Sequence, residues 1–200
     1  MSEILYTYGN EVYANITNQC DCNCVFCIRK NGDGLGDASC LWMKQDPALQ
    51  EIKAAMDGFD FTPYRELVYC GYGEPTCALE NLLQSAAYIR EKGLQVRLNT
   101  NGLGNLFHKR DIVPELACVV DQVSISLNAP DAVRYAEVTR PVFGEKGFDA
   151  MLQFAVSCKE HGIGTKFSVV DIIEPEEIAA CQRLSDQLGI PLRVRAYEKG

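Results

Sequence analysis

The sequence predicts an α/β protein built on a parallel sheet with crossover helices. Short apolar runs alternate along the chain with longer amphipathic stretches, and Gly or Pro closes most of the short runs. The 200 residues have 47% hydrophobic and 23% charged side chains, as soluble globular proteins do. We therefore expect one folding unit over residues 1–200, with a packed core.

The strands and helices follow in alternation to the end of the chain. Expected strands, rich in Val, Ile, Leu or aromatic residues, are 12–17, 66–70, 95–99, 122–127, 165–170 and 191–196. Expected helices, with apolar residues every three or four positions, are 47–57, 79–92, 111–116, 148–161 and 176–188. Pro175 with its acidic neighbours marks a helix start, and Gly162 and Gly189 mark helix ends. The irregular, glycine-rich segment 31–39 is expected to be a mobile loop.

Charge and hydropathy exclude two classes of partner. The formal net charge of −8 disfavours nucleic acid as the main ligand. No apolar run approaches the roughly 18–20 residues that cross a bilayer, and the N-terminus lacks a signal-peptide pattern. The sequence predicts a cytoplasmic protein without a membrane partner.

Four of the ten cysteines lie within eight residues, Cys20-Asp-Cys22-Asn-Cys24-Val-Phe-Cys27. This group directly follows the first expected strand, where parallel α/β folds carry functional loops. Cytosolic thiols are reduced, so metal or cluster ligation is favoured over disulfides. A closed zinc site usually needs a second knuckle, which is not apparent, and chance burial of four thiols is a weaker alternative. Cysteine thiolates on one loop are typical ligands of iron–sulfur clusters.

The spacing Cys20-x3-Cys24-x2-Cys27, with Phe26 before the last cysteine, resembles the motif of the radical S-adenosylmethionine (radical SAM) superfamily. The resemblance implies a single-domain partial (β/α)6 barrel of the TIM type, without a C-terminal auxiliary-cluster domain. It also implies a [4Fe-4S] cluster held by these three cysteines, with one iron left open to bind SAM. Cys22 falls between the motif positions and receives no ligand role.

Further motifs match the SAM-binding positions of that superfamily. Gly73-Glu74-Pro75 resembles the turn that binds the SAM amino group, although alone it is a common turn. Thr100 and Asn101 resemble the Thr-Asn-Gly after the third strand, which the residues alone explain as a turn.

The later strands supply the remaining candidates. Ser126 and Asn128 match positions that bind the ribose, although a half-solvated strand shows the same alternation. Arg195 is a candidate for a carboxylate of SAM or substrate, or for an ion pair at the barrel edge. In the superfamily, a motif of the fifth strand lies near the adenine of SAM. This chain keeps only the hydrophobic and acidic ends of that motif, so Phe26 is the expected adenine contact.

The resemblance is strongest to a compact subgroup encoded beside, or fused to, TatD-family nucleases. Its marks are Asn15-Ile16-Thr17-Asn18, Cys27-Ile28-Arg29, Gly71-Tyr72-Gly73-Glu74-Pro75-Thr76 and Arg193-Val194-Arg195-Ala196-Tyr197. It implies reductive cleavage of SAM to a 5′-deoxyadenosyl radical that abstracts hydrogen from a small-molecule or protein substrate. It also implies a reducing partner such as flavodoxin or ferredoxin, and association with a TatD-family nuclease. The alternative is an iron–sulfur or zinc module for electron transfer or scaffolding, without radical chemistry.

Overall fold

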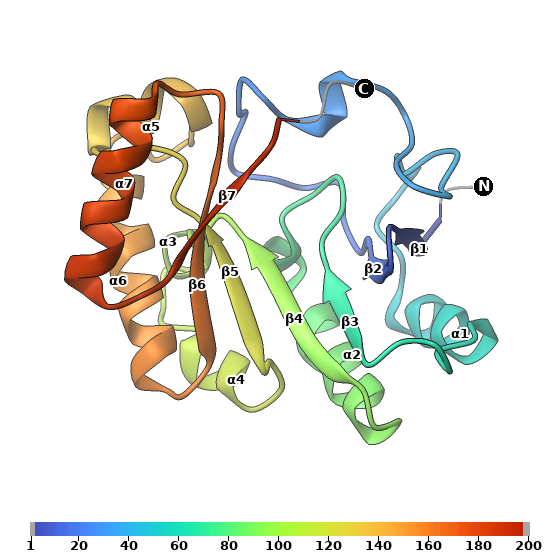
Figure 1. The fold of residues 1–200 in the computed structure, drawn as a ribbon. Helices are drawn as coiled ribbons and strands as arrows, with labels where there is room; N and C mark the ends of the chain where they lie inside the picture. Colours follow the sequence, from blue (N-terminus) through green and yellow to red (C-terminus); the bar gives the residue numbers. More distant parts are fainter. Residues whose placement is uncertain (1–2, 198–200) are drawn as a thin grey trace.

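The computed structural model describes residues 3–197 and contains one seven-stranded sheet whose strand order follows the chain (Figure 1). The strands are β1 (Leu5–Tyr8), β2 (Glu11–Ala14), β3 (Glu66–Tyr69), β4 (Gln95–Thr100), β5 (Gln122–Ser126), β6 (Gly164–Val170) and β7 (Leu192–Arg195). β2 to β7 are parallel and β1 is antiparallel to β2. β1 and β7 are the two edges and do not pair, so the barrel is partial and open, as expected. Residues 1–2 and 198–200 of the expected domain lie outside the described residues.

The helices connect the parallel strands and pack against one side of the sheet. They are α1 (Leu49–Gly58), α2 (Leu79–Glu91), α3 (Gly104–His108), α4 (Val113–Ala117), α5 (Ala132–Thr139), α6 (Lys146–Glu160) and α7 (Pro175–Leu188), with 3-10 turns η1 (Ile28–Lys30) and η2 (Pro75–Ala78). Over residues 3–197, none of these helices has the length and apolar character needed to cross a bilayer.

The core lies between the sheet and these helices because side chains on the strands alternate. On β5, Val123 and Ile125 are fully buried, whereas Ser124 and Ser126 face the other side and are only half-buried. α6 contributes Phe148, Met151, Phe154 and Cys158 to the core from one helical face. The inner face of the curved sheet is therefore left to polar side chains.

Three elements were not expected from the sequence. β1 forms a hairpin with β2 through Gly9, whose φ of 61° is in the left-handed region. α5 begins at Asp131, whose side chain accepts a hydrogen bond from the Arg134 backbone N–H. α3 is a short helix after the turn at Gly102. All five expected helices and six expected strands are present, and no end is shifted by more than three residues.

The segment 31–39, which is expected to be a mobile loop, is hydrogen-bonded to the hairpin and to the turn after β3. The Asp37 N–H donates to the Thr7 carbonyl, and the Leu41 N–H donates to the Asp33 carbonyl. The Tyr72 hydroxyl donates to the Gly32 carbonyl at 2.6 Å. These bonds enclose a second small core of Tyr6, Ala38, Leu41 and Tyr72.

Candidate cofactor site

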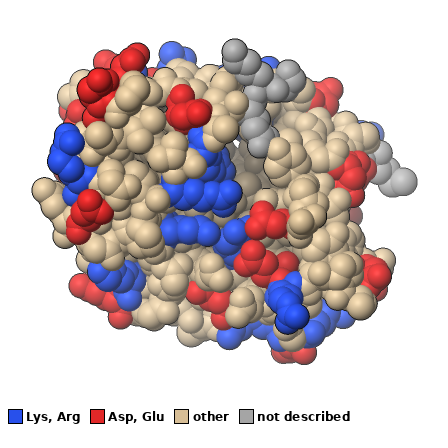
Figure 2. Space-filling model, in the orientation of Figure 1, with Lys and Arg blue, Asp and Glu red and all other residues tan. Residues whose placement is uncertain are grey.

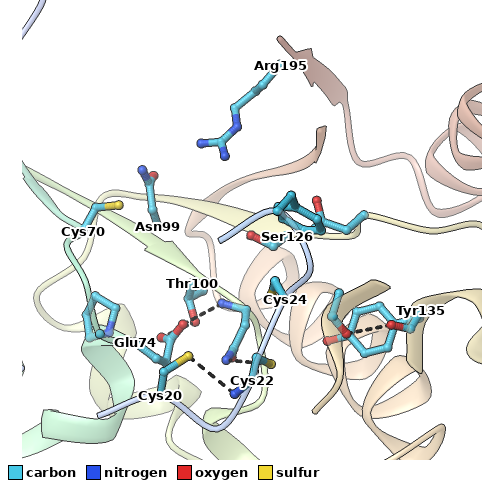
Figure 3. Close-up of a pocket in the computed structure, with 16 residues that line it drawn as sticks. Cys20, Cys22, Cys24, Cys70, Glu74, Asn99, Thr100, Ser126, Tyr135 and Arg195 are labelled. Carbon is cyan, nitrogen blue, oxygen red and sulfur yellow. Dashed lines mark hydrogen bonds between the residues drawn. The ribbon is translucent and has the colours of Figure 1, made fainter. Parts of the chain in front are cut away.

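A pocket of about 160 Å³ lies at the carboxyl ends of the parallel strands, where the predicted site residues converge (Figure 3). The loop after β2, the turn after β3 and the ends of β4, β5 and β7 form its wall. Every predicted residue except Cys27 lines this pocket: Cys20, Cys24, Phe26, Gly73, Glu74, Thr100, Asn101, Ser126, Asn128 and Arg195. Cys27 lines an adjoining, larger cavity that Cys24 and Phe26 also reach.

The cysteine loop carries free thiols. Cys20, Cys24 and Cys27 are all partly exposed, and Cys22 is buried. The Cys20 sulfur accepts from the Cys22 N–H at 3.5 Å, and the Cys27 sulfur accepts from Arg29 Nε at 3.4 Å. The loop has no regular structure before η1, so the thiols are held by these contacts and by backbone bonds to α5.

Cys22 lies between two of the expected ligands. Its thiol is within hydrogen-bonding contact of the Cys20 and Cys24 thiols, which raises the pKa of Cys22. The same contact lowers the pKa of Cys24, with Lys30 and Arg29 adding to the effect against burial. The thiolate is the form of cysteine that binds iron.

Glu74 is the centre of a buried hydrogen-bond network and is only 5% exposed. Its Oε1 accepts from the Thr76 N–H at 3.1 Å, the Thr76 hydroxyl at 2.8 Å and the Thr100 hydroxyl at 2.7 Å. Its Oε2 accepts from the Asn101 N–H at 2.8 Å, and its own N–H donates to the Gln19 carbonyl. Burial raises the pKa of Glu74 to about 7 against these bonds. Glu74 therefore ties the β3 turn to the end of β4 and to the residue before Cys20.

Gly73 allows this close approach of the two loops. A Cβ at Gly73 would lie 2.2 Å from the Thr17 carbonyl oxygen and 2.8 Å from the Gln19 carbonyl oxygen. No other residue type fits between the turn and the start of the cysteine loop without a backbone shift.

Asn101 links the network to the cysteine loop. Its side-chain amide donates to Asp21 Oδ1 at 2.5 Å and to the Cys22 sulfur at 3.5 Å. The other Asp21 oxygen is buried and has no partner among the described residues. Burial raises the pKa of Asp21.

Ser126, Asn128 and Arg195 line the opposite side of the pocket. Asn128 is buried with a φ of 55°, a backbone conformation that Asn tolerates better than most residues. Figure 3 shows the Arg195 guanidinium pointing from β7 toward the space between Asn99 and Ser126.

Several lining residues were not singled out from the sequence. Asn99 and Cys70 belong to strands that were predicted, and their inward direction follows from alternation along β4 and β3. Tyr135 and Thr139 come from α5, which was not predicted; the buried Tyr135 hydroxyl has no hydrogen-bond partner within residues 3–197. Asp21 lies between two cysteines of the motif, but no sequence pattern predicts that its side chain is buried.

The donor chemistry fits an iron–sulfur cluster. Three partly exposed thiols come from one loop, and cationic Arg29 and Lys30 lie beside them. Cys20 lines the smaller cavity, Cys27 lines the larger one, and Cys24 lines both. Within residues 3–197, no three His, Cys, Asp or Glu side chains are already arranged to chelate a metal ion. The fit therefore rests on ligand type and on the common loop, and the ligand role of Cys20, Cys24 and Cys27 stays a prediction.

Comparison with known proteins identifies the family. The sequence model of the Radical SAM superfamily matches residues 14–180. Fe-coproporphyrin III synthase from Methanosarcina barkeri is 30% identical over 179 residues, covering 82% of this chain and 41% of that protein. The chain thus spans less than half the length of this curated relative.

Solved structures share the fold. SuiB of Streptococcus suis, bound to its precursor peptide SuiA, superposes with a TM-score of 0.64 at 20% identity, covering 92% of this chain and 38% of SuiB. Native anSMEcpe with bound AdoMet gives a TM-score of 0.64 at 14% identity, covering 94% of this chain and 51% of that one. None of these comparisons distinguishes the TatD-associated subgroup. The chain belongs to the radical SAM superfamily, whose cofactors are a [4Fe-4S] cluster and S-adenosylmethionine.

Proposed function

We propose that this protein is a radical SAM enzyme that abstracts a hydrogen atom from a substrate. Cys20, Cys24 and Cys27 hold the [4Fe-4S] cluster in this proposal. When bound, the cluster and SAM supply one-electron cleavage of the SAM sulfonium to methionine and a 5′-deoxyadenosyl radical, which takes hydrogen from the substrate. Members of the superfamily are enzymes, which supports an enzymatic role.

The observation that carries the proposal is the convergence of separate motifs on one pocket. The cysteine loop, the Gly73-Glu74 turn, Thr100 with Asn101, and the end of β5 are far apart in sequence and line the same space. A structural zinc site would need only the thiols, and it would leave this polar pocket without a purpose.

The chain's own residues have distinct roles in this scheme. Glu74, Thr100 and Asn101 fix the SAM-facing turn to the cysteine loop through the bonds described above. Because Oε2 of Glu74 accepts one protein hydrogen bond, it has capacity to accept another from the SAM ammonium. Ser126 and Asn128 face the ribose, Phe26 the adenine, and Arg195 a carboxylate.

The second candidate function is an iron–sulfur or zinc module that transfers electrons or scaffolds partners without cleaving SAM. The position of Cys22 favours it, because its thiol lines the same pocket as Cys20 and Cys24 and would supply the fourth ligand of a closed set. In that case all metal coordination would come from the protein.

The partners proposed from the family resemblance are a flavodoxin or ferredoxin as reductant and a TatD-family nuclease. We propose a cytoplasmic location, where thiols remain reduced. Arg29 contacts the Cys27 sulfur and the ring of the exposed Trp42, and the Lys30 ammonium donates to the Cys24 carbonyl. These residues offer a basic face for an acidic electron donor.

The test is anaerobic reconstitution with iron and sulfide, followed by reduction in the presence of SAM. The proposal predicts 5′-deoxyadenosine and methionine in equal amounts from wild type and none from Cys24→Ala. A colourless protein with stoichiometric zinc, or an iron-loaded protein that leaves SAM intact, would support the second candidate instead.

A further inference from the structure

A cavity of about 710 Å³ opens from the cofactor pocket along the inner face of the sheet. Six residues line both spaces: Cys24, Phe26, Cys70, Asn99, Ser126 and Arg195. The two unpaired edge strands β1 and β7 both contribute to its wall, so the cavity occupies the side where the barrel does not close. Its volume is within the range of small-molecule binding sites, about 300–1,000 Å³.

The charge of this cavity is opposite to that of the whole chain. Among the residues that the structure describes, four basic side chains line it, Arg97, Lys166, Arg193 and Arg195, and one acidic side chain, Glu11. The chain as a whole carries a formal charge of −8. Figure 2 shows basic side chains gathered in the hollow in the middle of this face.

Three of these four cations form no ion pair within the described residues, although the charges of Glu11 and Glu66 act on Lys166 and that of Glu11 on Arg193. Arg97 pairs with Glu11 at 2.5 Å and Glu66 at 3.4 Å. Within residues 3–197, by contrast, Lys166, Arg193 and Arg195 form no ion pair. The pKa of Lys166 is lowered by burial and by the neighbouring charges of Arg97 and Arg193, which places these cations close together.

One donor in the cavity wall is also left without a partner. Arg97 is only 7% exposed, and its buried Nε forms no hydrogen bond to any described residue. A buried donor without a partner costs free energy, so the fold holds Arg97 in the cavity wall at a cost to its own stability.

The register of the sheet arranges the cations as a track toward the cofactor pocket. Lys166 pairs with Ser124, two residues and about 7 Å before Ser126 along the strand direction. Arg193 pairs with Ser168, which itself pairs with Ser126. Arg195 lies two residues further along β7. The opposite wall is aromatic, with Tyr6 and Tyr13 stacked at 5.2 Å between ring centroids.

We propose that this cavity binds the substrate, a small organic molecule bearing a carboxylate or phosphate, with its anionic group on Lys166 and Arg193 and its apolar body against Tyr6 and Tyr13. The identification as substrate rests on the proposed function, because the cavity leads to Cys24 and Phe26. Arginine and lysine donate charge-assisted hydrogen bonds to either oxyanion.

The test is calorimetric titration of the cluster-loaded chain, saturated with SAM, without reductant and at constant ionic strength. The probes are isophthalate, phenyl phosphate and, as a neutral control, isophthalamide. We expect at least one acid to bind and the amide not to bind. The tighter acid identifies the preferred head group. Because SAM is already bound, its own carboxylate site is not available to the probes.

Lys166→Gln with Arg193→Gln should weaken binding of the acid by about tenfold or more, since two charge-assisted contacts are lost. The control pair Lys146→Gln with Arg183→Gln removes the same charge from exposed positions on α6 and α7 and should bind like wild type. If the double variant does not fold, Arg193→Gln alone replaces it, because this residue is on the exposed edge strand. This single variant should lose less affinity for the acid than the double variant.

The inference is overturned if neither acid binds, if the amide binds equally well, or if Lys166→Gln with Arg193→Gln binds like wild type. SAM cleavage in the same preparations separates this failure from that of the proposed function. If the protein cleaves SAM but binds neither acid, only this inference is wrong. If it binds an acid but does not cleave SAM, the proposed radical SAM activity is wrong.

Discussion

The cofactor pocket and the basic cavity beside it are built in opposite ways. In the pocket, the Glu74 carboxylate is met by four protein donors and a glycine brings two loops into backbone contact. In the cavity, three cations have no ion pair within the described chain, and one buried guanidinium nitrogen has no partner. The pocket is also much smaller, about 160 Å³ against about 710 Å³.

This difference indicates a division of labour. A site whose central carboxylate, Glu74, is fully hydrogen-bonded has one geometry, which suits cofactors common to a whole superfamily. A cavity with unsatisfied charge stores affinity for a ligand, at the cost of folded-state repulsion. We therefore assign the cofactor chemistry of the family to the pocket and propose that the cavity determines substrate specificity. Substitutions can perturb the pocket and the cavity separately.

The largest expected effect is loss of the metal from the pocket. Cys24→Ala removes one of the three proposed cluster ligands and should reduce the iron content of anaerobically reconstituted protein to background. Cys118→Ala is the matched control, because Cys118 is exposed at the end of α4 and should retain full iron. Equal iron in both variants, measured by a colorimetric iron assay, would exclude Cys24 as a ligand.

Glu74→Ala should produce the next largest effect. It leaves the donors of Thr76, Thr100 and Asn101 buried without an acceptor, so the free energy of unfolding should fall by about 2–4 kcal/mol. SAM affinity should fall at least about tenfold while the iron content is kept. Urea unfolding and equilibrium dialysis with SAM measure both quantities, and Glu176→Ala on exposed α7 is the control. Unchanged stability would show that the network is not structural.

Gly73→Ala tests the contact between the two loops. The new methyl group would lie 2.2 Å from the Thr17 carbonyl oxygen, so we expect destabilisation of about 1–3 kcal/mol from overpacking. Gly58→Ala has open space around its Cβ and should be neutral or slightly stabilising. If the thermal midpoints of the two variants agree, the close approach is not a constraint.

Lys166→Met should give the smallest effect and the opposite sign. Because folding lowers the pKa of Lys166, its charged form is less stable in the fold than in the unfolded chain. The variant should gain up to about 1 kcal/mol at pH 7, after solvent screening. The gain should vanish as the pH rises past the ordinary lysine value of 10.5, where both states are neutral. Urea unfolding at pH 7 and above pH 10.5 measures this difference, with Lys146→Met as control. A loss of stability in Lys166→Met at pH 7 would contradict an unfavourable charge on Lys166 in the folded protein.

The sequence predicted the sheet better than the site geometry. Periodicity and the Gly and Pro punctuation indicate every parallel strand, because burial against helices requires that pattern. The hairpin strand β1 was missed because it pairs antiparallel with β2 and lies outside the alternation of strands and helices. The helix α5 was missed because it is short, with eight residues of which three are buried. Because α5 was not predicted, its residue Tyr135 was not predicted as part of the site either.

Within the pocket, residue identity was predictable and contacts were not. The cysteine spacing and the Gly73-Glu74 turn can be recognised by family resemblance. That Glu74 binds both Thr100 and Asn101 depends on register between β3 and β4, which no local pattern specifies. The basic cavity depends on the open edges of the sheet, so Arg97 and Lys166 had no signal in the sequence.

The central claim is that three thiolates leave one cluster iron open for SAM. Electron paramagnetic resonance of the reduced, reconstituted chain tests it, because SAM binding to an open iron changes the cluster signal. We predict a [4Fe-4S] signal that shifts when SAM is added. A signal that stays the same with saturating SAM, or a protein that holds no iron, would contradict the account.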